Sequence, residues 1–416
     1  MTLEPRRTKL FLTRTFSSRH HFIVVVLLGT LGACHDQPDP ANEPTRQIIW
    51  RADSNGYHTY RIPVLQVTPN GTLLAFSEGR KTGREDSGNI DLIVRRSTDN
   101  GQTWTPATII CDQGPDTCGN PAPVVDVHTN IVHLLMTRNI GSDLEDEIKA
   151  GTSLERRRVL YARSTDDGQT WTSPSDISST ASKPTWRWYA TGPANGIQLQ
   201  HGPHQGRLVI PANHSIPYDD RIVDGREDLP ADYYRSHVVF SDDGGQTWQL
   251  GGTHEPYTNE STVVELFDGV LMQNMRSYHG CRRTEEGERV DCLNRRAVAT
   301  SRNGGISWSP VRLDQTLVDP ICQASLFRYS WADTTHPRGI LLFSNPASST
   351  SRDHMTVRAS FDDGTTWPVH RVIEQGSASY SSLARLPNNR IGLLYEGTNY
   401  GEIVFSTFSL NWLLEG

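Results

Sequence analysis

A turn motif that ends in tryptophan occurs five times in this 416-residue chain and constrains its fold more than any other feature. Each copy reads Ser-x-Asp-x-Gly-x-x-Trp, with Asn replacing Asp once. The Asp or Asn side chain can cap the backbone of a tight turn, Gly can adopt a positive φ, and Trp can bury its ring beneath the turn. The copies begin at Ser97, Ser164, Ser241, Ser301 and Ser360.

Successive copies are 59 to 77 residues apart, which is the length of several strands rather than of one hairpin. The 34 Gly and 24 Pro residues leave little room for long helices. A turn residue followed by an apolar strand occurs six times, at 71–76, 130–135, 206–210, 269–272, 339–343 and 390–395.

The sixth of these hairpins is followed by a strand at 402–408 but by no tryptophan turn. A strand at 47–50 can supply the partner that is missing there. We therefore expect an all-β fold, a six-bladed β-propeller with five such turns, in which the N- and C-terminal strands close the last blade.

Residues 1–33 are typical of an export signal, because a basic stretch leads into a short apolar run at 22–33 that cannot span a bilayer. The run ends in Leu31-Gly-Ala-Cys34, which resembles the lipobox of bacterial lipoproteins. The resemblance implies acylation of Cys34, and His35 in place of Asp favours the outer membrane. An ordinary signal peptide followed by an unmodified Cys is the alternative.

We expect three parts: a signal peptide (1–33), a Pro-rich tether (34–46) and a propeller (47–416). The chain has 40 Lys and Arg against 47 Asp and Glu, and five of the basic groups lie in the signal. Such an acidic protein has no long-range attraction for nucleic acid, and we expect membrane contact only through a lipid at Cys34.

Two pairs of cysteines lie close together in the sequence, and export implies an oxidising compartment. We expect disulfides between Cys111 and Cys118 and between Cys281 and Cys292, which leaves Cys322 over. None of the spacings matches a zinc site. His201-Gly-Pro-His204 is better explained as a turn with two exposed histidines than as a metal site.

The tryptophan turns resemble the Asp boxes of sialidases, and Tyr60-Arg-Ile-Pro63 resembles the Arg-Ile-Pro motif of that family. From about Trp50 to Leu413 the chain resembles bacterial exo-α-sialidases of glycoside hydrolase family 33. The resemblance implies a retaining exo-α-sialidase that hydrolyses terminal α-linked sialic acids from glycoproteins, glycolipids and oligosaccharides through a sialyl-tyrosine intermediate. It also implies a monomer without metal or organic cofactor. A trans-sialidase and a non-catalytic sialoglycan-binding propeller are the alternatives.

A sialic acid carries a carboxylate on its anomeric carbon, and the planar donor fork of arginine matches that group. By local match to the family, the carboxylate-binding arginines are Arg61, Arg276 in Gln-Asn-Met-Arg and Arg352 in Thr-Ser-Arg. Only a fold whose inner strands converge on one axis can bring these distant residues together. Arg80 is expected to contact polar substituents of the sugar.

The acid/base matches Asp86 in the Gly-rich, charged loop 79–88, with Glu85 as the alternative. The nucleophile matches Tyr380, since sialidases use a tyrosine. A phenol is neutral until it attacks, whereas a carboxylate would be repelled by the substrate's own charge. The phenol needs a neighbouring base, which matches Glu260, with Glu265 as the alternative.

Three further features match less specific parts of the family's site. Glu396 matches a glutamate that orients the first arginine. Asn120, whose counterpart is often an acid, and the aromatic run Trp186-Arg-Trp-Tyr189 are expected either around the N-acetyl and glycerol groups or in blade packing. Asn70, Asn213 and Asn259 fall in glycosylation sequons, which we expect to be irrelevant in a bacterial lipoprotein.

Overall fold

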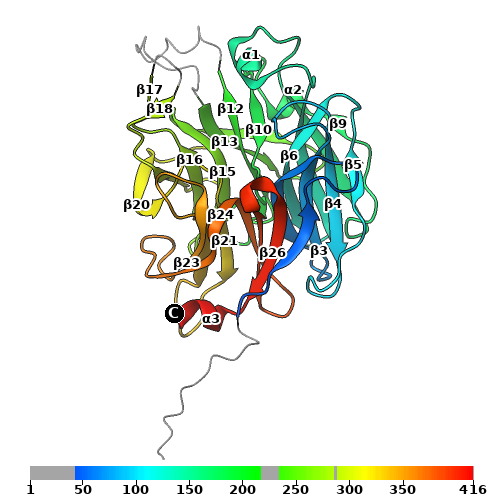
Figure 1. Cartoon of the computed structure of the whole chain (residues 1–416). Coiled ribbons are helices and arrows are strands. Elements are labelled where there is room, and N and C mark those ends of the chain that lie inside the picture. The colour runs from blue at the N-terminus through cyan, green and yellow to red at the C-terminus, as the bar shows by residue number, and fades with distance from the viewer. Residues whose placement is uncertain (1–42, 217–233, 285–287, 416) are drawn as a thin grey trace, which may run out of the picture. The chain divides into compact units, whose positions relative to one another are not determined.

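A computed structural model describes residues 43–216, 234–284 and 288–415. The predicted signal peptide, Cys34 and most of the predicted tether lie outside the described residues. Strands dominate the described part (Figure 1), and its helical segments are short. These segments are α1 (Glu145–Ala150), α2 (Ser178–Ala181), η2 (Thr398–Tyr400) and α3 (Leu410–Leu414).

We divide the described strands into six antiparallel groups, apart from a small hairpin of β17 (Arg282–Arg283) and β18 (Arg289–Val290). One parallel pairing, of Ile90 with Thr117, joins the first two groups, and one long strand is shared by the last two. The groups are β2 (Thr59–Val67), β3 (Leu73–Arg80), β4 (Ile90–Ser97) and β5 (Thr108–Cys111); β6 (Thr117–Asp126), β7 (Ile131–Asn139), β8 (Arg158–Ser164) and β9 (Ser175–Asp176); β10 (Tyr189–Thr191) and β11 (Ile197–Gln198) with β12 (Leu208–Ser215), β13 (Tyr234–Ser241) and β14 (Gln249–Thr253); β15 (Thr258–Glu265), β16 (Leu271–Ser277), β19 (Arg295–Ser301) and β20 (Arg312–Val318); β21 (Ser325–Ser330), β22 (Ile340–Pro346), β23 (Asp353–Ser360) and the first half of β24 (Val369–Arg385); and the second half of β24 with β25 (Ile391–Gly397), β26 (Glu402–Phe408) and β1 (Gln47–Arg51).

The first strands of the groups form a closed ring. Strand β2 contacts β6 and β24, β11 contacts β6 and β15, and β21 contacts β15 and β24. A ring of inner strands from which antiparallel sheets extend outward is the architecture of a β-propeller, as predicted. The count of six blades is our interpretation of this pairing.

The two ends of the chain meet in the last group, as the sequence predicted. Strand β1 pairs antiparallel with β26, with Gln47 opposite Phe405 and Ile48 opposite Val404. In Figure 1 the blue N-terminal segment accordingly lies beside the red β26. This pairing covers the outer edge of β26 and leaves β1 as the edge strand of the sheet.

The five Asp boxes follow the third strand of the first five groups and have the predicted turn chemistry. In the first box Ser97 Oγ accepts a hydrogen bond from Gly101 N at 2.9 Å, and Asp99 Oδ1 accepts one from Thr103 N at 2.9 Å. Gly101 has φ +85°, and a Cβ atom there would lie 2.2 Å from the ring of Phe405. Only glycine therefore fits this position, which joins two neighbouring groups.

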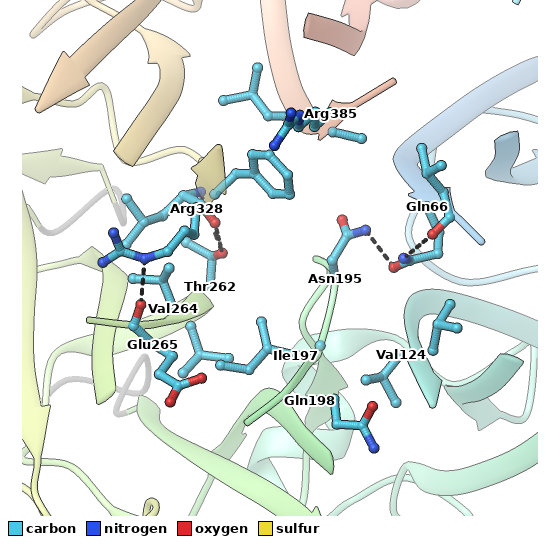
Figure 2. Close-up of a pocket in the computed structure, with 18 of the residues that line it drawn as sticks. Gln66, Val124, Asn195, Ile197, Gln198, Thr262, Val264, Glu265, Arg328 and Arg385 are labelled. Atoms are coloured by element: carbon cyan, nitrogen blue, oxygen red, sulfur yellow. Dashed lines mark hydrogen bonds between the residues drawn. The ribbon is translucent and has the colours of Figure 1, made fainter. Parts of the chain in front are cut away.

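The far ends of the first strands surround a cavity of about 450 Å³ (Figure 2). Its walls are largely apolar, and its polar side chains bond to the protein itself. Asn195 Nδ2 donates to Leu65 O at 2.6 Å and to Gln66 Oε1 at 2.8 Å, and Glu265 accepts hydrogen bonds from the backbone N–H groups of Gln200 and His201. Glu265 therefore lies at the opposite end of β15 from Glu260.

Candidate active site

A second cavity, of about 240 Å³, lies at the end where the first strands begin. The first strand of each group starts at this end of the propeller, and the second strand ends there, because neighbouring strands are antiparallel. Eight of the nine predicted catalytic and binding residues line it: Arg61, Arg80, Asp86, Asn120, Glu260, Arg276, Arg352 and Tyr380. The ninth, Glu396, lies behind Arg61.

Four of these eight residues lie on the first strand of a group, and each of the four is next to a β-bulge. The register of pairing shifts between Arg61 and Val64, between Gly119 and Ala122, between Thr258 and Ser261, and between Ala378 and Ser381. A bulge adds a residue to one strand and turns its side chain out of the regular alternation. The bulges thus accompany Arg61, Asn120, Glu260 and Tyr380 at their places on the cavity wall.

Tyr380, Glu260 and Arg276 form one hydrogen-bonded cluster. The Tyr380 phenol donates to Glu260 at 2.6 Å from Oε1 and 2.8 Å from Oε2. Arg276 Nη1 lies 2.7 Å from Glu260 Oε2 and 3.1 Å from the phenol oxygen. Burial and the Glu260 charge raise the pKa of Tyr380 well above its ordinary value, although Arg276 and Arg352 act in the opposite direction. The resting phenol is therefore neutral beside an acceptor for its proton.

Glu396 connects Arg61 with the backbone of Tyr380. Its Oε1 accepts hydrogen bonds from Arg61 Nε at 2.7 Å and from Ile62 N at 2.9 Å, and its Oε2 accepts one from Tyr380 N at 3.2 Å. Burial raises the pKa of Glu396, but Arg61 and the two backbone donors outweigh burial and lower it. Glu396 thus contacts the first of the predicted arginines and also the backbone of the strand that carries Tyr380.

Asp86 lies at the rim of the cavity, where 58% of its side chain is exposed, and its Oδ1 is 2.7 Å from Arg80 Nη2. Removal from water raises the pKa of Asp86, but the charges of Arg80 and Arg61 outweigh it and hold that pKa at about 2. The alternative acid, Glu85, is not among the lining residues, and its carbonyl accepts a hydrogen bond from Arg80 at 2.9 Å. Arg80 is also paired with buried Glu78 at 2.7 Å.

Asn120 and the aromatic run 186–189 were predicted to lie either around the substrate or in blade packing, and the structure places them differently. Asn120 lines the cavity, with its backbone N–H donating to Glu78 at 2.8 Å and its side chain accepting from Thr137 at 3.1 Å. Of the aromatic run, only Trp188 lines the cavity. Trp186 and Tyr189 are buried in a blade core, so the packing interpretation applies to them.

Sequence reasoning missed half of the cavity wall. The nine residues not predicted as site residues are Ile62, Glu78, Glu145, Arg157, Ala190, Tyr234, Asn259, Tyr278 and Arg289; Ile62 was noted only within the Arg-Ile-Pro motif and Asn259 only as a sequon. Glu145 lies on α1 and accepts a hydrogen bond from Tyr234, and burial raises its pKa. Arg157 lies 4.0 Å from the ring centre of Trp188. Glu145 and Arg157 lie in the connection between β7 and β8, and Tyr278 and Arg289 lie in the connection between β16 and β19, where no repeated pattern marks them. Glu78 lies on β3 and Tyr234 begins β13.

The structure joins Cys111 to Cys118 and Cys281 to Cys292 as disulfides, while Cys322 is a buried free thiol. Cys322 packs with Ile62 and Tyr380 behind the cavity. Within the described ranges, no group of three or more His, Cys, Asp and Glu side chains is arranged to hold a metal ion. The part of the chain that the structure describes contains no helix long and apolar enough to cross a membrane.

Fold and site together define a β-propeller whose axial cavity combines an anion-binding arginine cluster with a phenol–carboxylate pair. Comparison with known proteins agrees with this class. The model of the BNR repeat-like domain family matches residues 71–394. A sialidase of Micromonospora viridifaciens is 36% identical over 90% of this chain and 55% of its own length. An exo-alpha-sialidase of Aspergillus fumigatus is 32% identical over 87% of this chain and 86% of its own length.

Among solved structures, the Hadza microbial sialidase Hz136 matches with a TM-score of 0.75 and 29% identity over 89% of this chain and 69% of that one. The intramolecular trans-sialidase of Ruminococcus gnavus has a TM-score of 0.70 at 18% identity over 88% of this chain and 97% of its own, a likeness of fold alone. The chain belongs to the sialidase family of BNR-repeat proteins. It spans about half the length of the Micromonospora relative.

Proposed function

We propose that this protein is a retaining exo-α-sialidase of the glycoside hydrolase family 33 type, which removes terminal α-linked sialic acids from glycoproteins, glycolipids and oligosaccharides. The observation that carries the proposal is the Tyr380–Glu260 hydrogen bond of 2.6 Å in a cavity lined by Arg61, Arg276 and Arg352. Three guanidinium groups suit the substrate carboxylate, and a phenol with a carboxylate base suits attack beside that negative charge.

In the proposed first step, the phenol oxygen of Tyr380 attacks the anomeric carbon while Glu260 accepts the phenol proton. Asp86 donates a proton to the glycosidic oxygen, and the bond from that oxygen to the anomeric carbon breaks. In the second step Asp86 removes a proton from water, and the water oxygen attacks the anomeric carbon from the side that the aglycone left. The bond from that carbon to Tyr380 breaks, and Glu260 returns the proton to the phenol oxygen. Two inversions at one carbon give net retention.

The low pKa of Asp86 bears on this mechanism, because a general acid must carry a proton when substrate is bound. Arg80 and Arg61 hold Asp86 ionised in the free protein. A substrate carboxylate bound at Arg61 offsets part of that positive field and therefore raises the pKa of Asp86. Asp86 is also largely exposed, so its side chain can leave Arg80 for the glycosidic oxygen.

The remaining cavity wall suits the neutral parts of the sugar. Trp188 offers an apolar surface, and Asn120, Asn259 and Tyr278 offer hydrogen-bonding groups. We propose that these residues surround the N-acetyl and glycerol substituents. We also propose that the protein acts as a monomer without metal or organic cofactor, anchored through Cys34 in a bacterial cell envelope, with the outer membrane favoured.

The test is to incubate residues 35–416 with α2,3- and α2,6-sialyllactose and to identify the products. We expect free sialic acid and lactose, with the sialic acid released first as the α-anomer. A sialylated acceptor or an anhydro sugar as the main product would identify a transferase instead. Binding of sialyllactose without turnover would identify a sialoglycan-binding propeller.

A further inference from the structure

The turn between β25 and β26 contains three consecutive residues in the left-handed region, none of them glycine. Thr398, Asn399 and Tyr400 have φ of 50°, 49° and 67°. Asn tolerates this region, but a β-branched residue and a bulky aromatic are unfavourable there. Strain of this kind persists where surrounding contacts impose it, and it concentrates at functional sites.

The contacts of this turn keep its backbone in place. Asn399 N donates to Ser377 Oγ at 3.2 Å, and Thr398 Oγ1 donates to Glu402 Oε2 at 3.1 Å. Gly401 N donates to Thr398 O at 3.0 Å. With the turn held in this way, the side chain of Tyr400 reaches two of the predicted carboxylate-binding arginines.

Tyr400 contacts Arg61 through its ring and Arg352 through its hydroxyl. The guanidinium carbon of Arg61 lies 4.3 Å from the centre of the Tyr400 ring. Arg352 Nη1 donates a hydrogen bond to the Tyr400 hydroxyl at 3.2 Å. Tyr400 is not among the residues that line the candidate active-site cavity, whereas Arg61 and Arg352 are.

Arg61 is already paired with the carboxylate of Glu396, whereas the contacts of Arg352 are with uncharged groups. Within the described ranges Arg352 has no carboxylate at ion-pair distance, and its partners are Tyr400, the Ser379 hydroxyl at 3.3 Å and the Ile321 carbonyl at 3.2 Å. A neutral hydroxyl and an aromatic face orient a guanidinium group without neutralising it. A carboxylate in the place of Tyr400 would compete with the anionic substrate.

We propose that Tyr400 is a positioning residue, which holds Arg61 and Arg352 in the orientation that binds a substrate carboxylate. This inference rests on the proposed function for the identity of the anion. It assigns a role to the strained turn, which carries the ring and hydroxyl that contact the two arginines.

The test compares Tyr400→Phe and Tyr400→Gly with wild type. Tyr400→Phe removes only the hydroxyl, and Tyr400→Gly removes the whole side chain while accepting the positive φ without strain. Tyr329→Phe is the matched control, since its ring lies 5.1 Å from the Arg385 guanidinium and its hydroxyl donates to Asn389 O at 2.7 Å. Arg385 lies at the other cavity (Figure 2), away from the arginines of the proposed site.

The measurements are kcat and KM for sialyllactose and inhibition by free sialic acid and by its methyl ester, with thermal melting to establish folding. We expect Tyr400→Phe to weaken inhibition by free sialic acid by about three- to tenfold, and Tyr400→Gly to weaken it further. We expect KM to rise with kcat changed less than about twofold, since the carboxylate is held in both ground and transition states. The methyl ester, which has no negative charge, should bind all variants alike.

Wild-type inhibition constants in both folded Tyr400 variants would overturn the inference, as would equal losses for the free acid and the ester. The proposed function is tested separately by turnover in wild type. A wild-type protein that binds sialic acid through Tyr400 but does not cleave sialyllactose would support the positioning role and contradict the hydrolase. A wild-type protein that binds no sialic acid would contradict both.

Discussion

The phenol oxygen of Tyr380 lies 2.6 Å from Oε1 of Glu260, although 120 residues separate them in the chain. They belong to first strands of two different groups, β24 and β15, and meet only because those strands converge on the axis. Arg276 bonds to both residues, which couples the proposed nucleophile and base to the proposed carboxylate site. Substitutions in this cluster should therefore affect binding and chemistry in distinguishable ways.

Tyr380→Phe should abolish sialic acid release while leaving thermal stability close to wild type, because the ring still packs with Ile62 and Cys322. A 3-fluorosialyl fluoride should label wild type on the peptide that contains Tyr380, and mass spectrometry reads this out. The Phe variant should not be labelled. A label on a carboxylate, or equal labelling of the variant, would show that Tyr380 is not the nucleophile.

Arg276→Lys should lower kcat/KM by about tenfold or more, since hydrogen bonds to charged groups are worth about 1.5–3 kcal/mol each. Lysine keeps the charge but loses the planar fork that reaches Glu260, Tyr380 and an incoming carboxylate together. The control is Arg302→Lys, whose side chain is 83% exposed, and it should behave as wild type. Equal kinetics of the two variants would remove Arg276 from the carboxylate site.

Asp86→Ala should slow substrates with poor leaving groups most. An aryl sialoside with an acidic phenol needs little protonation, so its release should be less affected than that of lactose from sialyllactose. Comparison of the ratio of kcat/KM for the two substrates measures this difference. Glu85→Ala is the adjacent control and should leave the ratio unchanged; the reverse pattern would assign the acid to Glu85.

Buried histidines should make the fold sensitive to acid. Burial lowers the pKa of His237 to about 3, and its Nδ1 lies 3.1 Å from that of His214. The unfolded chain, with a histidine pKa near 6.5, binds more protons between pH 3 and 6.5, so stability falls as pH drops below about 6.5.

Urea unfolding between pH 7 and pH 5 should show this fall in wild type. His237→Gln should be less stable at pH 7 but should lose stability less steeply toward pH 5, by up to about 1.4 kcal/mol per pH unit for one proton. The exposed His370→Gln is the control and should keep the wild-type slope. An unchanged slope in His237→Gln would exclude His237 as a source of acid sensitivity.

Cys34→Ser should release the protein from the membrane fraction without changing kcat or KM, because the Pro-rich segment 35–46 separates the predicted anchor from the propeller. Fractionation of cells that express each form, with a sialoside assay on both fractions, measures this. Membrane attachment of the variant would mean that another feature anchors the chain.

The sequence by itself determined the repeating architecture of this protein. The Asp boxes are local structures, since Ser97, Asp99 and Gly101 bond within one turn, and local chemistry can be recognised without a fold. The pairing of the two termini is not local, but it could also be predicted, because each end of the chain has one strand without a partner. Family motifs around Arg61 and Tyr380 located much of the site.

Only the tertiary structure decided between neighbouring candidates. Glu260 and Glu265 lie on one strand, and the ring of first strands places the first beside Tyr380 and the second in the opposite cavity. Trp186 and Trp188 differ in the same way, one in a core and one in the cavity.

The physical reason is that the site is built from strand starts and bulges on different sheets, with partners such as Arg61 and Glu396 separated by 335 residues. Which side chain a bulge turns toward the axis depends on the pairing of the neighbouring strand. Local sequence does not contain that pairing, so it emerges only when the ring of strands closes.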